Sequence, residues 1–311
     1  MTPGAGLTPE QSLAVDEALA VLRRGGLVAV PTETVYGLAA DAEAEPAVRR
    51  IFSVKGRPAD HPLIVHLAGV EHLEGWCSHL PPSAEVLADA CWPGPLTLLL
   101  PRGRRVLDVV TGGRAAVGIR VPAHAMTTEL LRRFGGGLAA PSANRFGRVS
   151  PTAAEHVRAD LGDDVDLVLD GGPCPVGVES TIVDCTAAVA QVLRPGGIPT
   201  EQIEDLLRGE LAPTSGPSRA PGMLASHYAP RCPVLLAGDP DEARLLAAAK
   251  PGRALIGVDV DLVTYARQLY EQLRDADRAG APAIVALLPP AHGLGHAIRD
   301  RLIKAAAARG G

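Results

Sequence analysis

Apolar and polar positions near the N-terminus predict a helix followed by a short strand. Thr8 with Gln11 three residues later forms a capping box, and Pro9 suits the first helical turn. After this start signal, apolar residues recur at the spacing of one helix face, namely Leu13, Ala14, Ala18, Leu19 and Leu22. Two glycines at 25–26 end the helix, and the apolar run at 27–30 predicts a strand.

From there to about residue 205, short apolar runs alternate with helical stretches. We predict strands at 63–67, 96–100, 117–121, 138–140, 167–169, 181–183 and 192–193. We predict helices near 45–54, 83–91, 125–134 and 152–161. Alternation of this kind is typical of an α/β fold, so we expect a twisted mixed sheet with flanking helices.

A stretch rich in proline, glycine and serine at 213–222 divides the chain, because these residues resist both helix and sheet. We therefore predict a catalytic domain at 1–207, a linker at 208–229 and a smaller domain at 230–311. In the smaller domain, apolar runs alternate with helical stretches at 234–236, 241–249, 255–258, 264–278, 284–288 and 294–308. This β-α-β-α-β-α order is Rossmann-like in layout, but the glycine fingerprint of a dinucleotide site is missing.

Composition narrows the classes of function. Of the 311 residues, 47% are apolar but only 3% are aromatic, so we expect a core of alanine, valine and leucine. The formal net charge of -5 argues against a protein that coats nucleic acid non-specifically, because that mode needs many lysines and arginines. The five cysteines include no C-x-x-C pair, and we find no signal peptide and no apolar run of membrane-spanning length. We expect reduced thiols and a cytoplasmic protein.

Candidate chemistry gathers in turns that follow the predicted strands, where side chains can converge on a ligand. Residues 31–38 (PTETVYGL) follow the first strand and offer two hydroxyls, a carboxylate and a phenol. The alternative is that this segment is only a turn. Lys55, Gly56, Arg57 and Pro58 place two cations beside a flexible glycine, which suits an anion with carboxylate and phosphate groups. The alternative there is a solvated helix C-terminus.

Small hydroxyl and amide groups follow another predicted strand. Ser142 and Asn144 lie in the segment PSAN, and Ser150 stands where it can cap the next helix. Capping alone is an alternative role for Ser150. The segments 177–181 (GVEST) and 193–196 (LRPG) also place polar groups beside turns.

The sequence contains no nucleophile elbow, no G-x-x-x-x-G-K-[ST] phosphate loop and no zinc-binding cluster of histidine and cysteine. His292 and His296 are four residues apart, but the Gly-Leu-Gly between them is a poor helix and a weak metal pair. The remaining option is catalysis by positioning and charge neutralisation, as in nucleotidyl transfer.

Seven ordered segments resemble the Sua5/YrdC/YciO family, specifically its two-domain Sua5 branch, over essentially the whole chain. They are PTETVYGLAADA at 31–42, KGRPADHPLIVH at 55–66, WPGPLTLLL at 92–100, VGIRVPAH at 117–124, APSANRFGRVSPT at 140–152, GVESTIVD at 177–184 and LRPGGI at 193–198. The linker exit APGMLASHYAP at 220–230 resembles the signature that leads into the Sua5 domain.

The resemblance implies an enzyme, a nucleotidyltransferase that joins L-threonine, bicarbonate and ATP into threonylcarbamoyl-AMP for the t6A modification of tRNA. It implies Mg²⁺ on the ATP phosphates and a downstream tRNA threonylcarbamoyl-transfer machinery. By resemblance, threonine would be held around Thr34, His66, Arg120, Ala140 and Ser180. ATP would be held around Arg57, His61, Ala116, Ser142, Ser150, Arg194 and Tyr228. The set that gathers bicarbonate and phosphate would be Lys55, Arg57, Ser142 and Asn144, with no protein ligand to a metal.

Two positions depart from the family pattern, since His61 stands where asparagine is usual and Ala116 where threonine is frequent. The linker ends in apolar and hydrogen-bonding groups that need a place to dock, so we expect it to close over the nucleotide, with Tyr228 reaching ATP. One rival hypothesis is an RNA-binding module whose basic surface is lined by Arg102, Arg104, Arg105, Arg114, Arg145 and Arg148. Another is an accessory protein that binds nucleotide without completing adenylation.

Overall fold

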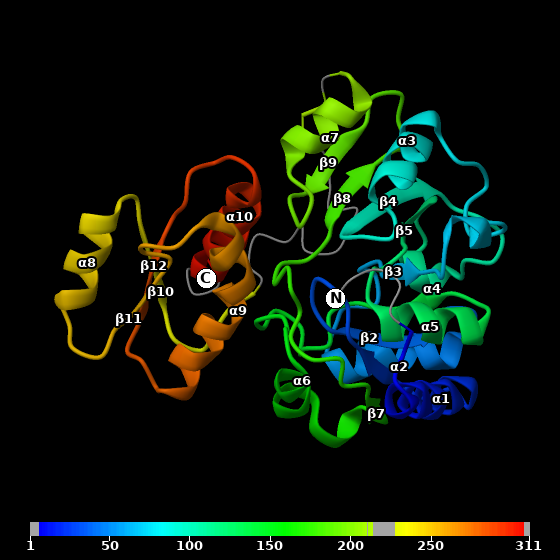
Figure 1. Ribbon diagram of the computed structural model, residues 1–311, viewed down its shortest axis with the longest axis horizontal. Helices are drawn as coiled ribbons and strands as arrows, with labels where there is room; N and C mark the ends of the chain where they lie inside the picture. The colour runs from blue at the N-terminus through cyan, green and yellow to red at the C-terminus, as the bar shows by residue number, and fades with distance from the viewer. Residues whose placement is uncertain (1–5, 210, 214–227, 308–311) are drawn as a thin grey trace.

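The computed structural model describes residues 6–209, 211–213 and 228–307, which form two units built on separate sheets (Figure 1). The larger unit has a nine-stranded sheet and the smaller a three-stranded sheet. In Figure 1 the smaller unit lies beside the larger one, with α9 and α10 nearer to it than α8. Within these described ranges, no helix is both long and apolar enough to cross a membrane.

The strands of the larger unit are β1 (Val28–Val30), β2 (Gly37–Asp41), β3 (Ile64–His66), β4 (Leu96–Pro101), β5 (Ala116–Arg120), β6 (Leu138–Ala139), β7 (Leu167–Val168), β8 (Thr181–Asp184) and β9 (Gln191–Arg194). Its α-helices are α1 (Pro9–Arg23), α2 (Glu45–Lys55), α3 (Pro82–Cys91), α4 (Asp108–Thr111), α5 (Ala125–Phe134), α6 (Ala154–Leu161) and α7 (Thr200–Leu207). The strand order is β7-β1-β2-β6-β3-β5-β4-β8-β9, with parallel and antiparallel neighbours. The predicted twisted mixed sheet with flanking helices is confirmed.

Alternation along the strands assigns side chains to two faces of this sheet. Val65 on β3 and Val117 and Ile119 on β5 belong to the main core cluster, which also contains apolar residues of α2, α3 and α6. On the opposite face, α1 and α5 pack over β1, β2 and β6. His66 and Arg120 directly follow the core residues Val65 and Ile119 along their strands, so their side chains lie on this second face. Polar side chains gather there.

The capping box that starts α1 is confirmed, because Thr8 accepts from the backbone N–H of Gln11 and the Gln11 side chain accepts from Thr8 N–H. The predicted apolar stripe is wrong in one member, since Leu13 is 70% exposed. Val15 and Val21 are buried and were not predicted. Their burial follows from the packing of α1 against both α5 and the sheet, which widens its buried face.

The smaller unit has the predicted order of elements: β10 (Val234–Ala237), α8 (Pro240–Ala248), β11 (Ala254–Ile256), α9 (Leu262–Arg278), β12 (Ile284–Leu287) and α10 (Leu294–Ala307). Its strands are parallel and ordered β10-β12-β11, so the third strand is central. In a dinucleotide-binding Rossmann half the second strand is central, so the likeness extends to layout alone.

Three strands or α-helices of the larger unit escaped prediction: β2, the four-residue helix α4 and α7. β2 is a run of small residues that we assigned to a polar turn, although Leu38 and Ala40 pack on one face and Ala39 on the other. α7 lies between the last predicted strand and the linker, and it packs on α3 through Ile203. The linker boundaries at 208–229 remain a prediction, because residues 210 and 214–227 lie outside the described residues.

The two units approach closely where Gly177 meets α9. Gly177 has a φ of 80°, and a Cβ placed there would lie 2.4 Å from Arg267 Cα and 2.5 Å from the carbonyl oxygen of Ala266. Backbone atoms cannot yield as a flexible side chain can, so this glycine allows α9 to pack against the larger unit.

We predict that Gly177→Ala destabilises the protein more than Gly172→Ala. Both glycines have positive φ, which costs alanine about 1–2 kcal/mol, but a Cβ on Gly172 meets nothing within 4 Å. Overpacking at Gly177 adds about 1–3 kcal/mol. The measurement is the urea-induced unfolding of both variants, and equal losses of stability would refute this account of the contact between the units.

Candidate active site

A pocket opens on the second face of the large sheet, next to the smaller unit. It is lined by Thr32, Thr34, Val35, Gly37, Arg57, Ile64, His66, Arg120, Ala140, Pro141, Ser142, Glu179, Ser180, Arg194 and Tyr228. These residues come from the turns after β1 and β6, from the start of β2, from the segment after α2, from β3, β5 and β9, from the segment before β8, and from the linker exit.

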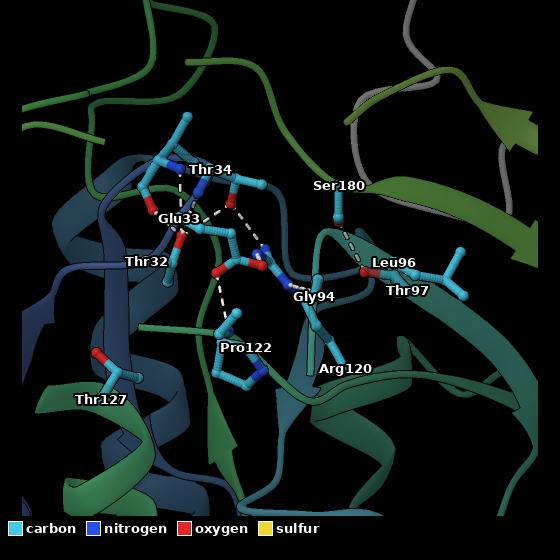
Figure 2. Close-up of polar contacts among 12 residues, drawn as sticks. Thr32, Glu33, Thr34, Gly94, Leu96, Thr97, Arg120, Pro122, Thr127 and Ser180 are labelled. Carbon is cyan, nitrogen blue, oxygen red and sulfur yellow. Dashed lines mark hydrogen bonds and ion pairs between the residues drawn. The ribbon is translucent and has the colours of Figure 1, made fainter. Parts of the chain in front are cut away.

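The turn after β1 is organised by Thr32. Its hydroxyl donates to the carbonyl of Val35 (2.6 Å) and accepts from the backbone N–H groups of Thr34 (3.1 Å) and Val35 (3.2 Å). The Thr34 hydroxyl lies 2.8 Å from that of Thr32 (Figure 2). The hydroxyl of Thr32 donates its only proton to Val35, so the hydroxyl of Thr34 is the donor in this pair. Thr32 therefore shapes the turn, and Thr34 presents a hydroxyl to the pocket.

Arg120 anchors this turn to the sheet. Its guanidinium donates to Thr34 Oγ1 (2.8 Å), Glu33 Oε1 (2.6 Å) and the carbonyl of Gly94 (3.2 Å). The second oxygen of Glu33 accepts from the backbone N–H of Ala123 at 3.0 Å. Figure 2 shows Glu33 and Thr34 on one side of the guanidinium and Gly94 beside it. The Glu33–Arg120 ion pair is buried, so its hydrogen bonds hold the turn in one geometry.

His66 is the direct strand neighbour of Arg120, because β3 and β5 pair in parallel at these two residues. Burial lowers the pKa of His66 to about 3, and the charge of Arg120 acts in the same direction. The ring is therefore neutral near pH 7, and its Nδ1 has no hydrogen-bond partner among the described residues. A neutral imidazole with an unused nitrogen in a pocket is suited to bind a ligand.

Ser180 and Arg194 form the opposite wall. Arg194 donates to the carbonyl of Ser180 (2.9 and 3.1 Å) and to its hydroxyl (3.0 Å), which also lies 2.8 Å from Thr97 Oγ1 (Figure 2). A Cβ at Gly196 would lie 2.3 Å from the carbonyl oxygen of Glu179. The glycine of the LRPG segment thus lets the chain after β9 pack against the backbone before β8.

Glu179 lies beside Ser180 and is buried, with three groups around its carboxylate. Ser150 donates to it at 2.5 Å, Tyr270 at 2.8 and 3.0 Å, and Arg301 at 2.9 Å. Burial acts to raise the pKa of Glu179, but the charges of Arg301 and Arg194 outweigh it and lower the pKa to about 2. The carboxylate is ionised and fully engaged.

The alternative interpretation of Lys55 as part of a solvated helix C-terminus is wrong. Its ammonium group is buried and donates to the carbonyls of Ser142 (2.6 Å) and Asn144 (2.5 Å). Burial lowers the pKa of Lys55 well below its usual value, and the charge of Arg57 acts in the same direction. These two hydrogen bonds hold the PSAN turn in place. Lys55 is the last residue of α2, since Gly56 in the αL conformation ends the helix directly after it.

Arg57 reaches the pocket itself. It donates to the carbonyls of Pro62 (2.9 Å) and His61 (3.5 Å), and its guanidinium stands 5.7 Å from the centre of the Phe146 ring. Burial lowers the pKa of Arg57 to about 10, so the cation persists at neutral pH. His61 packs edge-on against the same ring, and burial lowers its pKa, with Arg57 contributing.

Nine of the residues expected from the sequence line one pocket: Thr34, Arg57, His66, Ala140, Arg120, Ser142, Ser180, Arg194 and Tyr228. Lys55, Asn144 and Ser150 lie directly behind its wall through the bonds described above, and Asn144 donates to the carbonyls of Arg145 and Arg148. The structure does not bring Ala116 to the pocket. It lies at the far end of β5 and packs on a small apolar cluster around Ile64 and Leu99.

Sequence reasoning missed Arg301 and Tyr270, which reach Glu179 from the smaller unit. Neither lies in a polar turn, and both are on helix faces that otherwise read as apolar. Glu33 and Glu179 were visible inside PTET and GVEST but were not selected. Their place in the sequence could have identified them, since each directly precedes a hydroxyl residue that was selected.

One group in the described part of the chain has the spacing of metal ligands: Glu155, His156 and Glu271. His156 Nδ1 accepts from the backbone N–H of Thr152 at 3.2 Å. The neutral ring therefore carries its proton on Nε2, which lies 3.2 Å from Glu271 Oε2. A protonated nitrogen has no lone pair to offer a metal, and Nε2 makes no hydrogen bond among the described residues, so this group is not a metal site as arranged. The weak sequence candidate His296 instead pairs with Glu201 at 3.3 Å.

A pocket lined by three arginines and several hydroxyl donors on an α/β scaffold defines a protein that binds small anionic molecules. Comparison with known proteins narrows this class. The sequence model of the Sua5/YciO/YrdC family, described as "Telomere recombination", matches residues 20–196. A second model, described as "Threonylcarbamoyl-AMP synthase, C-terminal domain", matches residues 198–307. The chain belongs to the Sua5/YciO/YrdC family and has the two-domain arrangement.

Relatives and solved structures agree along nearly the full length. The chain is 43% identical over 319 residues to the threonylcarbamoyl-AMP synthase of Pyrococcus abyssi, covering 94% of both chains. It is 40% identical over 324 residues to the enzyme of the same name from Bacillus subtilis, covering 95% of this chain and 93% of that one. The crystal structure of P. abyssi Sua5 complexed with L-threonine superposes with a TM-score of 0.90 and 41% identity, covering 95% and 94% of the two chains.

The lowered pKa of His66 generates a prediction about stability. In the unfolded chain this histidine binds a proton as pH falls through 6.5, whereas the folded form resists until about pH 3. Folding stability contributed by His66 is thus present above 6.5 and is lost as pH falls, by about 1.4 kcal/mol per pH unit. We predict that His66→Gln flattens the pH dependence of urea unfolding between about pH 7 and pH 5. Exposed His79→Gln is the control, and parallel curves for wild type and His66→Gln would contradict the prediction.

Proposed function

We propose that this protein is a threonylcarbamoyl-AMP synthase that makes threonylcarbamoyl-AMP and pyrophosphate from L-threonine, bicarbonate and ATP. The observation that supports it most is the joining of two sets of groups in one pocket. Thr34, Arg120 and Ser180 form a hydroxyl-rich end, and Arg57 and Arg194 supply cations beside it. One end suits an amino acid and the other suits phosphates.

At the threonine end, hydroxyl groups are available and charges are already balanced. Arg120 is neutralised by Glu33, so it orients Thr34 more than it attracts an anion. The Thr34 hydroxyl can turn its proton from Thr32 to a substrate carboxylate, and the Ser180 hydroxyl and neutral His66 are close to the same pocket. We assign Thr34, His66, Arg120, Ala140 and Ser180 to threonine.

At the nucleotide end, Arg57, Ser142, Arg194 and Tyr228 line the pocket, and we assign them to ATP. Ser150 acts through its bond to Glu179, and His61 through its packing on Phe146. Lys55 and Asn144 hold the backbone that carries Ser142. The lid proposed for the linker rests on residues that mostly lie outside the described ones, and Tyr228 alone is placed in the pocket wall.

The proposed chemistry has two stages. The threonine amine attacks CO₂ derived from bicarbonate, forming a C–N bond and releasing a proton to give a carbamate. A carbamate oxygen then attacks the α-phosphorus of ATP, and the bond to the β-phosphate oxygen breaks to release pyrophosphate. Both steps join anions, so positioned cations and hydrogen-bond donors supply the catalysis without a covalent enzyme intermediate.

Mg²⁺ is proposed as the companion of ATP. The described pocket offers it no free carboxylate, because Glu179 is held by Arg301, Ser150 and Tyr270, and nearby Glu33 is held by Arg120. The donor set therefore does not fit a metal site built by the protein. Mg²⁺ would be held by phosphate oxygens and water.

The rival role as an RNA-binding module is disfavoured by three of the six arginines proposed for it. Arg102 pairs with Asp108, Arg105 with Glu43 at 2.6 Å, and Arg145 with Asp164 at 2.5 Å. Arginines neutralised by carboxylates contribute little to phosphate binding. We propose that the product passes to a tRNA threonylcarbamoyl-transfer machinery in the cytoplasm, where the five free cysteines would remain reduced.

The function is tested by mass spectrometry of a reaction with threonine, ATP and ¹³C-labelled bicarbonate. We predict a mixed anhydride of threonine carbamate and AMP that carries the label, with pyrophosphate release that needs all three substrates. Pyrophosphate release without threonine, or nucleotide binding without the anhydride, would instead support the accessory-protein hypothesis.

The assignment of Ser180 is tested by Ser180→Ala. Loss of a buried hydroxyl that meets substrate should raise KM for threonine about tenfold and leave KM for ATP within about twofold. Thr111→Val, which removes a buried hydroxyl outside the pocket, serves as the control. Equal increases in both KM values would count against placing threonine at this end.

A further inference from the structure

The smaller unit supplies buried polar side chains to the wall of the pocket. Arg301 on α10 is 0% exposed, and Tyr270 on α9 is also fully buried. Both donate to Glu179, which lies in the larger unit and lines the pocket. These bonds therefore cross from one unit to the other and end at the pocket.

Arg301 contacts both chain segments that carry the Ser180–Arg194 pair. Its Nε donates to Glu179 Oε2 (2.9 Å), one residue before Ser180, and its Nη1 donates to the carbonyl of Pro195 (2.9 Å), one residue after Arg194. A single guanidinium thus ties the segment before β8 to the end of β9. Asp300 accepts from the same Nη1 at 2.7 Å, and this bond helps to fix the position of the guanidinium.

Tyr228 completes the link. Its ring is stacked on Tyr270 with the centroids 5.9 Å apart, and Arg301 stands over it at 5.0 Å. Tyr228 itself lines the pocket and is 1% exposed. Tyr270 and Arg301 therefore hold two pocket residues, Glu179 by hydrogen bonds and Tyr228 by ring contacts.

We propose that Arg301 and Tyr270 are positioning residues, through which the smaller unit sets the geometry of Ser180, Arg194 and Tyr228 for substrate binding. The inference rests on the proposed function and deepens it by giving the C-terminal domain a role in the same site. A domain attached only for stability would not need two buried donors on one pocket carboxylate.

The test compares two tyrosines of the same helix. Tyr270→Phe removes the hydroxyl that donates to Glu179 but keeps the ring that stacks on Tyr228. Tyr265→Phe is the matched control, because Tyr265 is also buried on α9 and its hydroxyl donates to the carbonyl of Leu287 (2.9 Å) inside the smaller unit. Both variants retain the fold more safely than loss of the Arg301 charge, which would leave Glu179 buried without its partner.

We expect Tyr270→Phe to raise the calorimetric Kd and the KM for threonine about tenfold, while Tyr265→Phe changes them by less than about twofold. Thermal melting of the two variants measures the stability that each loses. Similar Kd values for both variants, whether unchanged or equally raised, would overturn the positioning role. Wild-type protein that binds no threonine would overturn the proposed function itself, so the two failures are distinguishable.

Discussion

The buried charge of Glu179 is the constraint on which the two-domain structure depends. A carboxylate at 5% exposure cannot remain ionised without compensation, because its lost hydration must be replaced by hydrogen bonds and an opposite charge. The larger unit alone provides the hydroxyl of Ser150 and the nearby charge of Arg194. The remaining donors, Tyr270 and Arg301, belong to the smaller unit. The contacts that dock the two units thus also complete this part of the pocket wall.

The pairing of both carboxylates explains how an anion-binding pocket can be built without excess repulsion. Glu33 neutralises Arg120, and Glu179 neutralises Arg301. Lys55 gives its hydrogen bonds to backbone carbonyls, so its role is to shape the PSAN turn. The other polar groups of the pocket wall are hydroxyls, a neutral imidazole and the cations Arg57 and Arg194. Such a site binds anions by directed donors more than by net charge.

The parts of this arrangement that were predictable are those encoded locally. The Thr8 capping box could be predicted from its residue spacing, and the helix α9 from its apolar period. The strands that carry His66 and Arg120 were also predicted, but their pairing in register was not. β2 was missed because a run of small residues carries little strand signal. The burial of Lys55 depends on carbonyls almost ninety residues away, and Arg301 meets Glu179 across 122 residues. Contacts at such separations leave no trace in local pattern.

The most direct test of the central claim is a double-mutant cycle on threonine affinity with Glu179→Gln and Arg301→Lys. Each substitution keeps the shape of its side chain more closely than alanine would, and calorimetric Kd values for both single variants and the double variant complete the cycle. If Arg301 acts on the pocket through Glu179, each single variant raises the Kd for threonine. The Kd of the double variant is then no higher than that of the single variant that binds threonine more weakly. Losses that add independently would contradict the account.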